Sequence, residues 1–244
     1  MKQLYILKAG TSFPEIVRHY GDFDDWTRAA LGAIRVPVTV VDLQNEEPLP
    51  PPSQCAGVVV TGSHEMVTDR LPWSVRVEQW IPALLAAAVP FFGICYGHQL
   101  LAQAMGGTVA YHPSGIEAGS VGVRRLPEGA DDVLFAALPD NFVAHVVHSQ
   151  TVTALPPNAV RLAANAHEPN HAFRLGENAW GVQFHPEYRA DIMRAYLLGC
   201  AGKLAQAGRS VPAMLLSVRP VTVASRLLAD FGALVERAWQ AGRC

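Results

Sequence analysis

Charged residues are scarce in this chain. They make up 16% of its 244 residues, and 19 lysines and arginines nearly balance 21 aspartates and glutamates, which gives a formal net charge of −2. No basic stripe is visible, although such a stripe is typical of nucleic-acid-binding proteins. The composition therefore argues against a nucleic-acid partner. Half of the residues are apolar, which is enough for a sizeable core.

No hydrophobic run is both long and uninterrupted. The stretch from Ile81 to Gly97 contains Pro82, Pro90 and Gly93, so it predicts a helix followed by a buried strand and not a membrane span. The N-terminal sequence MKQLYILKAG is too short before its polar break to be a signal peptide. We therefore expect a soluble, cytoplasmic protein with no membrane contact.

Motifs for metals, disulfides and nucleotides are also missing. The four cysteines, at positions 55, 95, 200 and 244, form no CxxC pair, and no Cys/His cluster has zinc spacing. Reduced thiols in the cytoplasm are the simplest interpretation. The chain lacks a G-x-x-x-x-G-K-[ST] phosphate loop. We expect no metal and no cofactor.

Short β-branched runs alternate with helical stretches in the first half of the chain. Nearly continuous apolar strands are expected where a parallel sheet is buried on both faces, and this alternation predicts an α/β fold. The later, shorter strands predict an antiparallel or mixed extension. The expected strands are 4–7, 36–41, 57–60, 89–94, 108–111, 121–126, 142–147, 160–164, 171–175 and 180–184.

The expected helices cover 73–88 and 189–207, and Asp24 or Asp25 is a plausible N-cap for the first helical stretch. Beyond Pro220, apolar residues recur at helical spacing up to Trp239. A helix docked on the core explains this stripe more simply than a partner-binding helix. We predict one domain over 1–244, with a core of about 1–207 and a C-terminal helical extension of about 220–241.

The strongest local signal is Gly93-Ile94-Cys95-Tyr96-Gly97-His98-Gln99, between a predicted strand and a helical run. A G-x-nucleophile-x-G motif in this context places the nucleophile on a sharp turn, where the glycines avoid a clash. The positive end of the following helix favours the thiolate of Cys95. By itself the motif also fits a buried structural cysteine beside a glycine turn.

A second signal, Gly181-Val182-Gln183-Phe184-His185-Pro186-Glu187, ends another apolar run. His185 can take a proton from a thiol and later give it to a leaving amine. Glu187 can accept a hydrogen bond from the other ring nitrogen and fix the tautomer. Alone, the His-Pro-Glu tripeptide would read as a surface loop.

Together the two motifs resemble those of the class I glutamine amidotransferases, whose triad is Cys-His-Glu. The resemblance covers roughly residues 1–190 and extends to the glutaminase domain of GMP synthases and to γ-glutamyl peptidases. It implies a flavodoxin-like, mostly parallel sheet with helices on both faces. It also implies amide hydrolysis at a γ-glutamyl group through a thioester on Cys95, with His185 and Glu187 completing the triad.

The same resemblance implies the remaining site residues. The Gly62 and Tyr96 amides would form the oxyanion hole, and Gln99, Ser149 and Gln150 would bind the substrate. The segment Thr61-Gly62-Ser63-His64 departs from the Gly-Pro or Gly-Gly-Pro pattern of many members. Ser149 also fits a simple turn residue.

Other polar residues have simpler explanations. His98 is expected to be a packed helix residue, and five further histidines (64, 145, 148, 167 and 171) form no ligand set with metal spacing. The segment 19–26 follows the first strand and could shape the acceptor side of the pocket, but a helix-capping cluster is the commoner explanation.

Three functions remain open. The chain could hydrolyse glutamine and deliver ammonia to a separate synthase subunit, because it has no room for an ATP-binding acceptor domain. It could instead be a γ-glutamyl peptidase that acts alone on γ-glutamyl peptides or conjugates. The third possibility, a non-catalytic partner-binding protein, fits poorly with the intact residues Cys95, His185 and Glu187.

Overall fold

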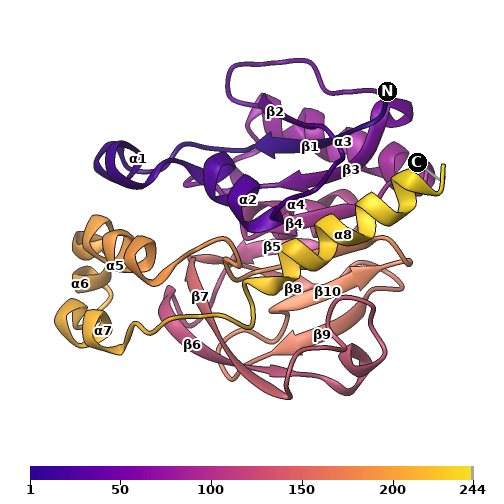
Figure 1. Ribbon diagram of the computed structural model, residues 1–244. Helices are drawn as coiled ribbons and strands as arrows, with labels where there is room; N and C mark the ends of the chain where they lie inside the picture. The colour runs from indigo at the N-terminus through magenta and orange to yellow at the C-terminus, as the bar shows by residue number, and fades with distance from the viewer. Residues whose placement is uncertain (243–244) are drawn as a thin grey trace.

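The computed structural model describes residues 1–242 (Figure 1). The strands are β1 (Gln3–Lys8), β2 (Val38–Asp42), β3 (Cys55–Val60), β4 (Phe91–Ile94), β5 (Thr108–Tyr111), β6 (Glu117–Arg125), β7 (Asn141–His148), β8 (Gln150–Ala154), β9 (Val160–Ala164), β10 (Ala172–Leu175) and β11 (Ala179–Val182). The α-helices are α1 (Pro14–Tyr20), α2 (Phe23–Leu31), α3 (Pro72–Ala86), α4 (Tyr96–Ala104), α5 (Ala190–Gly199), α6 (Ala201–Gln206), α7 (Val211–Ser217) and α8 (Arg226–Gln240).

Nine strands form one sheet in the order β2-β1-β3-β4-β11-β10-β9-β6-β7. The pairs from β2 to β11 are parallel, and the pairs from β11 to β7 are antiparallel. A separate ribbon pairs β5 with β8. The predicted flavodoxin-like α/β fold with a mixed extension is confirmed.

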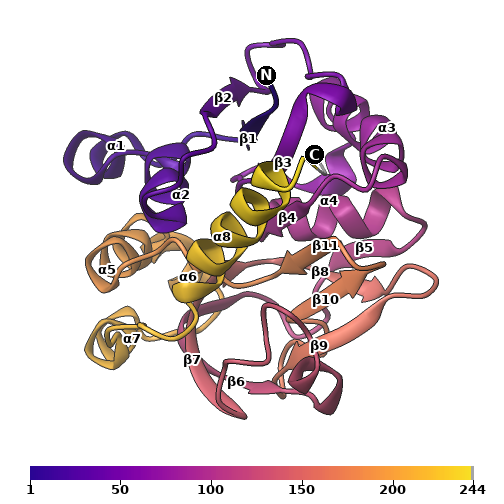
Figure 2. The same cartoon turned by 45° about the vertical axis from the view of Figure 1, so that its right-hand side comes forward.

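Helices cover both faces of the parallel part of the sheet (Figure 2). Every residue of β3, β4 and β11 is buried, which explains their continuous apolar sequences. On one face Val58, Val60 and Phe91 pack in a cluster with residues of α3 and α4. On the other face Phe92 and Trp180 pack in a cluster with residues of α8.

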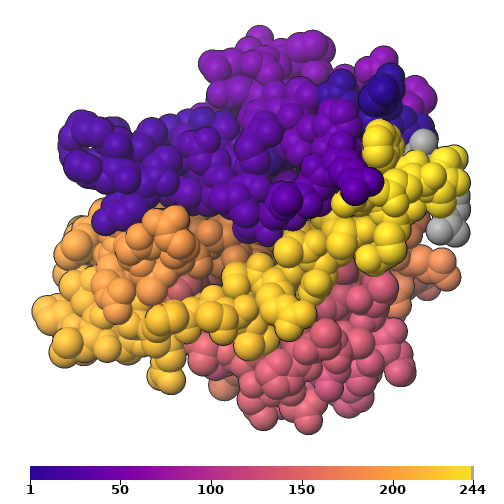
Figure 3. Space-filling model, in the orientation of Figure 1, coloured from indigo at the N-terminus to yellow at the C-terminus, as the bar shows by residue number. Residues whose placement is uncertain are grey.

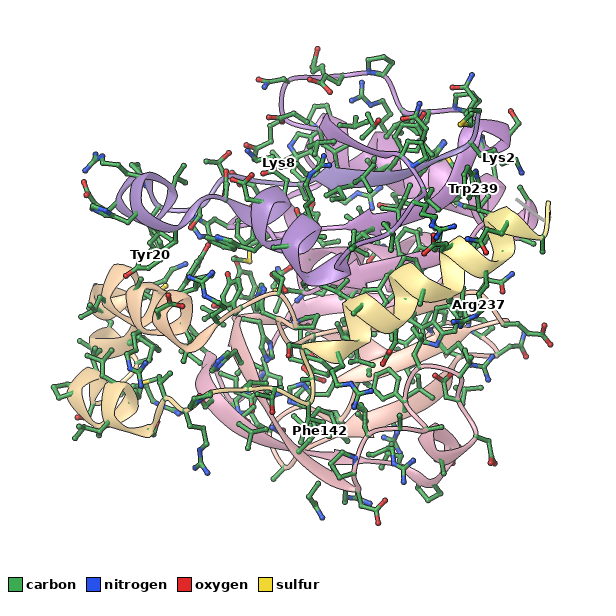
Figure 4. The ribbon with its side chains drawn as sticks, in the orientation of Figure 1. Lys2, Lys8, Tyr20, Phe142, Arg237 and Trp239 are labelled. Carbon is green, nitrogen blue, oxygen red and sulfur yellow. The ribbon has the colours of Figure 1, made fainter. Side chains whose placement is uncertain are left out.

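The C-terminal helix α8 lies against the sheet, as its apolar stripe predicted. Phe231 packs on Phe92 with ring centroids 5.4 Å apart, and a Cβ at Gly57 would lie 2.7 Å from a methyl group of Val235. Trp239 belongs to the partly buried residues around this cluster (Figure 4). In the space-filling view, the yellow C-terminal segment runs across the front of the molecule, between the indigo N-terminal part above and the rose-coloured part below (Figure 3).

Several local predictions were wrong. The segment 150–154 is a strand that was not expected, since its Gln-Thr-Val-Thr-Ala sequence carries only one large apolar residue. The helix expected over 189–207 is two helices, α5 and α6, which meet at Cys200. Asp22, and not Asp24 or Asp25, is the N-cap of α2, and Asp25 completes the capping box.

Asp22 also joins α2 to the end of β1. Its carboxylate accepts a hydrogen bond from the Ser12 amide at 2.8 Å and lies 2.8 Å from the Lys8 ammonium group. The capping interpretation of segment 19–26 therefore holds for Asp22. Within residues 1–242, no helix has the length and apolar character that crossing a membrane requires.

Candidate active site

Cys95 sits on a sharp turn between β4 and α4. Its backbone angles, φ 48° and ψ −94°, are rare for a residue with a side chain and cost about 1–3 kcal/mol. The Cys95 amide donates to the Val182 carbonyl of β11 at 2.8 Å, which holds the turn against the neighbouring strand. A Cβ at Gly93 would lie 2.4 Å from the Gly97 oxygen, and one at Gly97 would lie 2.5 Å from the Val60 oxygen. Both glycines are therefore needed for the close approach of strand and helix.

A cavity of about 320 Å³ opens over this turn. Six of the predicted site residues line it: Cys95, Tyr96, Gln99, Ser149, Gln150 and His185. Glu187 lies behind His185, and Gly62 lies beside it. The fold thus brings together residues from the ends of three parallel strands and from the β7–β8 connection, all on the carboxyl side of the sheet.

His185 and Glu187 form a buried pair beyond the end of β11. The Nδ1 atom of His185 lies 2.7 Å from Oε1 of Glu187, and the two residues are only 3% and 5% exposed. The His185 amide donates to the His145 carbonyl of β7 at 2.8 Å. The Tyr188 ring stacks on the imidazole at 4.1 Å. These contacts fix the ring and turn its Nε2 atom away from Glu187.

The charge state of His185 follows from its neighbours. Burial by itself would lower the pKa of this imidazole, but Glu187 and Cys95 outweigh burial and raise the pKa to about 10. The ring therefore carries a proton at neutral pH.

The Gly62 loop passes directly against His185. A Cβ at Gly62 would lie 2.9 Å from the His185 Cε1 atom. The Thr61 hydroxyl oxygen accepts from the Ala9 amide at 3.0 Å, and the Ser63 hydroxyl donates to the Ala9 carbonyl at 3.0 Å. The loop that departs from the common family pattern is therefore held by contacts within this chain.

Tyr96 is the first residue of α4, so its amide belongs to the first helical turn, whose four N–H groups have no intrahelical acceptor. That turn also directs the positive end of the helix at the Cys95 sulfur. The Tyr96 side chain is directed toward α3, where its hydroxyl donates to the Ser74 hydroxyl at 2.6 Å.

Two glutamine side chains link Cys95 to the β7–β8 connection. The Gln99 Nε2 atom donates to the Gln150 carbonyl and to the Gln183 Oε1 atom, both at 2.9 Å. Gln183 Nε2 in turn donates to Cys95 Sγ at 3.4 Å. Because a main-chain carbonyl only accepts, it fixes the orientation of Gln99 and, through Gln99, that of Gln183.

Gln183 was quoted in the second motif but given no role at the sequence level. It lies two residues before His185, on the same side of the extended segment, and that spacing is the signal that could have identified it. The side chain is completely buried. We call the Gln99–Gln183–Cys95 chain the glutamine relay.

Glu117 is a further residue that sequence reasoning missed. Its carboxylate lies 3.0 Å from His148 Nε2 and 3.4 Å from His171 Nε2, and it accepts from Asn165 at 2.8 Å. Burial alone would raise the pKa of Glu117, but the hydrogen bonds from the two histidines hold it well below its usual range. His148 Nδ1 lies 2.9 Å from the Gln150 carbonyl. Glu117 therefore fixes the His148 ring, which in turn contacts the main chain of Gln150 in the predicted substrate-binding segment.

Two predictions about neighbouring residues can be compared with the structure. His98 is a packed helix residue, completely buried with its ring 4.9 Å from that of Phe173. From segment 19–26, Phe23 lines the cavity. Among the described residues, no set of three or more His, Cys, Asp or Glu side chains has the arrangement of a metal site.

Comparison with known proteins gives a consistent result. The family model described as glutamine amidotransferase class-I matches residues 16–199. A GMP synthase (glutamine-hydrolyzing) of Parafrankia sp. is 38% identical over 153 residues, which cover 60% of this chain and 27% of that synthase. The chain thus matches about a quarter of that relative's length.

Solved structures share the fold over nearly the whole chain. A glutamine amidotransferase from Thermotoga maritima has a TM-score of 0.76 at 22% identity, covering 97% of this chain and 99% of that one. A glutamine amidotransferase from Methylobacillus flagellatus has a TM-score of 0.72 at 25% identity, covering 99% and 95%.

Proposed function

The chain belongs to the class I glutamine amidotransferase family, and we propose that it hydrolyses the amide bond of a γ-glutamyl group through a thioester on Cys95. One observation carries this proposal: a single cavity contains both the strained Cys95 turn and the imidazole of the buried His185–Glu187 pair. A non-catalytic protein would have no need of a buried, charged imidazole beside a strained cysteine.

In the first half-reaction, the Cys95 thiolate attacks the γ-carbonyl carbon. The Gly62 and Tyr96 amides are the proposed donors to the oxyanion of the tetrahedral intermediate. The C–N bond then breaks, and the departing amine takes the proton from His185 Nε2. The neutral imidazole next removes a proton from water, which attacks the thioester and releases glutamate. The proton on His185 and the thiolate are thereby restored.

The glutamine relay limits how the glutamyl group is held. Both N–H bonds of Gln99 are used within the protein, so only its Oε1 atom remains for the substrate. That oxygen can accept from the substrate α-ammonium group but cannot donate to the α-carboxylate. Ser149 and Gln150, which line the same part of the cavity, are the proposed partners of the α-carboxylate end.

Gln183 has a separate proposed role. An amide N–H that points at sulfur stabilises a thiolate more than a neutral thiol, because hydrogen bonds to charged acceptors are the stronger ones. Gln183 is therefore a positioning residue for the nucleophile. It adds to the effects of the helix terminus and of the imidazolium ion.

The acceptor of the released amine is a further question. If the amine is ammonia from glutamine, a separate synthase subunit is the proposed partner, by analogy with the GMP synthases that this chain resembles over part of their length. The Gly62 loop, however, is held by contacts within the chain. That observation favours hydrolysis by the isolated chain, as in the alternative of a γ-glutamyl peptidase.

The test is release of glutamate by the purified protein from glutamine, γ-glutamyl peptides and γ-glutamyl amines. Cys95→Ser should abolish the release of glutamate while the fold remains intact, because an unactivated hydroxyl is a weak nucleophile. Cys55→Ser is the matched control, since Cys55 is a buried cysteine in β3 outside the cavity. Near wild-type turnover by the Cys95→Ser protein would contradict the proposed function.

A further inference from the structure

The cavity continues past Cys95 along a wall of aromatic rings. Phe13, Phe23, His64 and Tyr196 all line it, and we call them the aromatic wall. The wall comes from segments that are far apart in sequence: α2 and α5 contribute one residue each, and Phe13 and His64 come from loops. In Figures 1 and 2, α1, α5 and α6 lie together at one end of the sheet.

Contacts place the aromatic wall on the His185 side of the nucleophile. A Cβ at Gly62 would lie 2.9 Å from His185 Cε1 and 3.3 Å from a ring carbon of Phe23. The rings of Phe23 and His64 are 6.1 Å apart, and those of Phe13 and His64 are 4.5 Å apart. The wall therefore begins next to His185 and extends outward from it.

The imidazole of His64 acts as part of this apolar surface. Its Nε2 atom lies 3.2 Å from the Tyr196 hydroxyl. Burial of the ring and then the charge of Lys203 lower the pKa of His64, which favours the neutral ring although the residue as a whole is exposed. A neutral ring can stack on a second aromatic group without first losing a charge.

Ammonia leaves most of this wall unused. Under the proposed function, the leaving amine takes its proton from His185 and so departs on the His185 side. Ammonia has a single heavy atom and would touch no more than the start of the wall. An apolar extension of a catalytic cavity is expected where the substrate itself carries an apolar group.

We propose that the aromatic wall is a leaving-group subsite, and that the substrate is a γ-glutamyl peptide whose second residue is aromatic. Lys203 lies at the exposed rim of the same cavity and supplies a partner for the carboxylate of that residue. Glu65 also lines the cavity, so the charge selectivity depends on Lys203 outweighing it. This inference rests on the proposed function and specifies its substrate class.

The first test compares kcat/KM for glutamine, γ-glutamylglycine and γ-glutamylphenylalanine. We expect the phenylalanine peptide to exceed the glycine peptide by about 10- to 100-fold, which is typical of burying an apolar group in a specificity pocket. Phe13→Ala should reduce that ratio by about tenfold and leave γ-glutamylglycine nearly unchanged. Equal kcat/KM values for the two peptides in the wild-type protein would overturn the subsite.

The second test concerns the carboxylate. γ-Glutamylphenethylamide lacks this group and should be a poorer substrate than γ-glutamylphenylalanine, and Lys203→Met should remove most of the difference. Arg209→Met is the matched control, because Arg209 is an exposed basic residue that does not line the cavity. If both variants behave like the wild-type protein, Lys203 has no part in the subsite.

Failure of this inference is distinguishable from failure of the proposed function. If glutamine or γ-glutamylglycine is hydrolysed in a Cys95-dependent way without any aromatic preference, the proposed function stands and the subsite is refuted. If none of the γ-glutamyl compounds is hydrolysed, and γ-glutamylphenylalanine leaves no γ-glutamyl group on the acid-quenched protein, both proposals fail.

Discussion

Replacing Gln183 with methionine tests how Cys95, the proposed nucleophile, is activated. Methionine has a similar length but cannot donate a hydrogen bond to the Cys95 sulfur. Hydrogen bonds to charged groups contribute about 1.5–3 kcal/mol. Sulfur is a weaker acceptor than oxygen, so this bond, with an N···S distance of 3.4 Å, is expected at the lower end of that range. A loss of about 1.4 kcal/mol is a tenfold change in an equilibrium constant. We therefore expect the Gln183→Met substitution to lower the reactivity of Cys95 about tenfold.

Alkylation by iodoacetamide measures this effect without requiring a substrate, because the thiolate is the reactive species. In Gln183→Met, the rate constant for alkylation of Cys95 at a fixed, neutral pH should fall about tenfold. Gln103→Met is the matched control, since Gln103 lies on α4, the helix that follows Cys95, but is not the glutamine that donates to the sulfur. If the Gln183→Met protein has normal thermal stability and Cys95 is alkylated at the wild-type rate, the hydrogen bond from Gln183 does not activate Cys95.

Three further predictions follow from the site. Glu187→Gln removes the carboxylate that helps raise the pKa of its imidazole partner to about 10, so the alkaline limit of activity should move to lower pH; a pH–rate profile with an unchanged alkaline limb would contradict this. A glutamine-mimicking electrophile should label Cys95 before Cys200. Both cysteines line the cavity, but burial raises the pKa of the Cys200 thiol. Peptide mass mapping that finds the label first on Cys200 would contradict this. Gly97→Ala should lose about 1–3 kcal/mol in denaturant unfolding through overpacking, whereas Gly122→Ala, with no heavy atom within 4 Å of its Cβ, should be nearly neutral.

Much of the fold was predictable because buried parallel strands are read from short, continuous apolar runs. β1, β3 and β4 are of this kind, and each was expected within two residues of its observed limits. β8 was missed because it pairs only with β5, outside the main sheet, and its Gln-Thr-Val-Thr-Ala sequence carries only one large apolar residue. The break at Cys200 is flanked by Gly199 and Gly202, but single glycines are tolerated inside helical patterns, so they did not indicate the end of a helix.

The sequence indicated the candidate catalytic residues because a strand–turn–helix motif and a His-x-Glu motif each specify geometry locally. Glu117 and the aromatic wall gave no such signal. The wall collects Phe13, His64 and Tyr196 from three separate segments, and only the tertiary fold brings these together. The roles assigned to the site residues, and the division into a core and a C-terminal extension, stay predictions.

The most direct test of the account is detection of the thioester on Cys95. The protein would be mixed with a γ-glutamyl substrate, quenched in acid within the first turnovers, digested and analysed by mass spectrometry. The account predicts a γ-glutamyl group on the peptide that contains Cys95, which disappears on treatment with hydroxylamine and is absent from Cys95→Ser. Steady release of glutamate without any γ-glutamyl group on Cys95, or with that group on another residue, would contradict it.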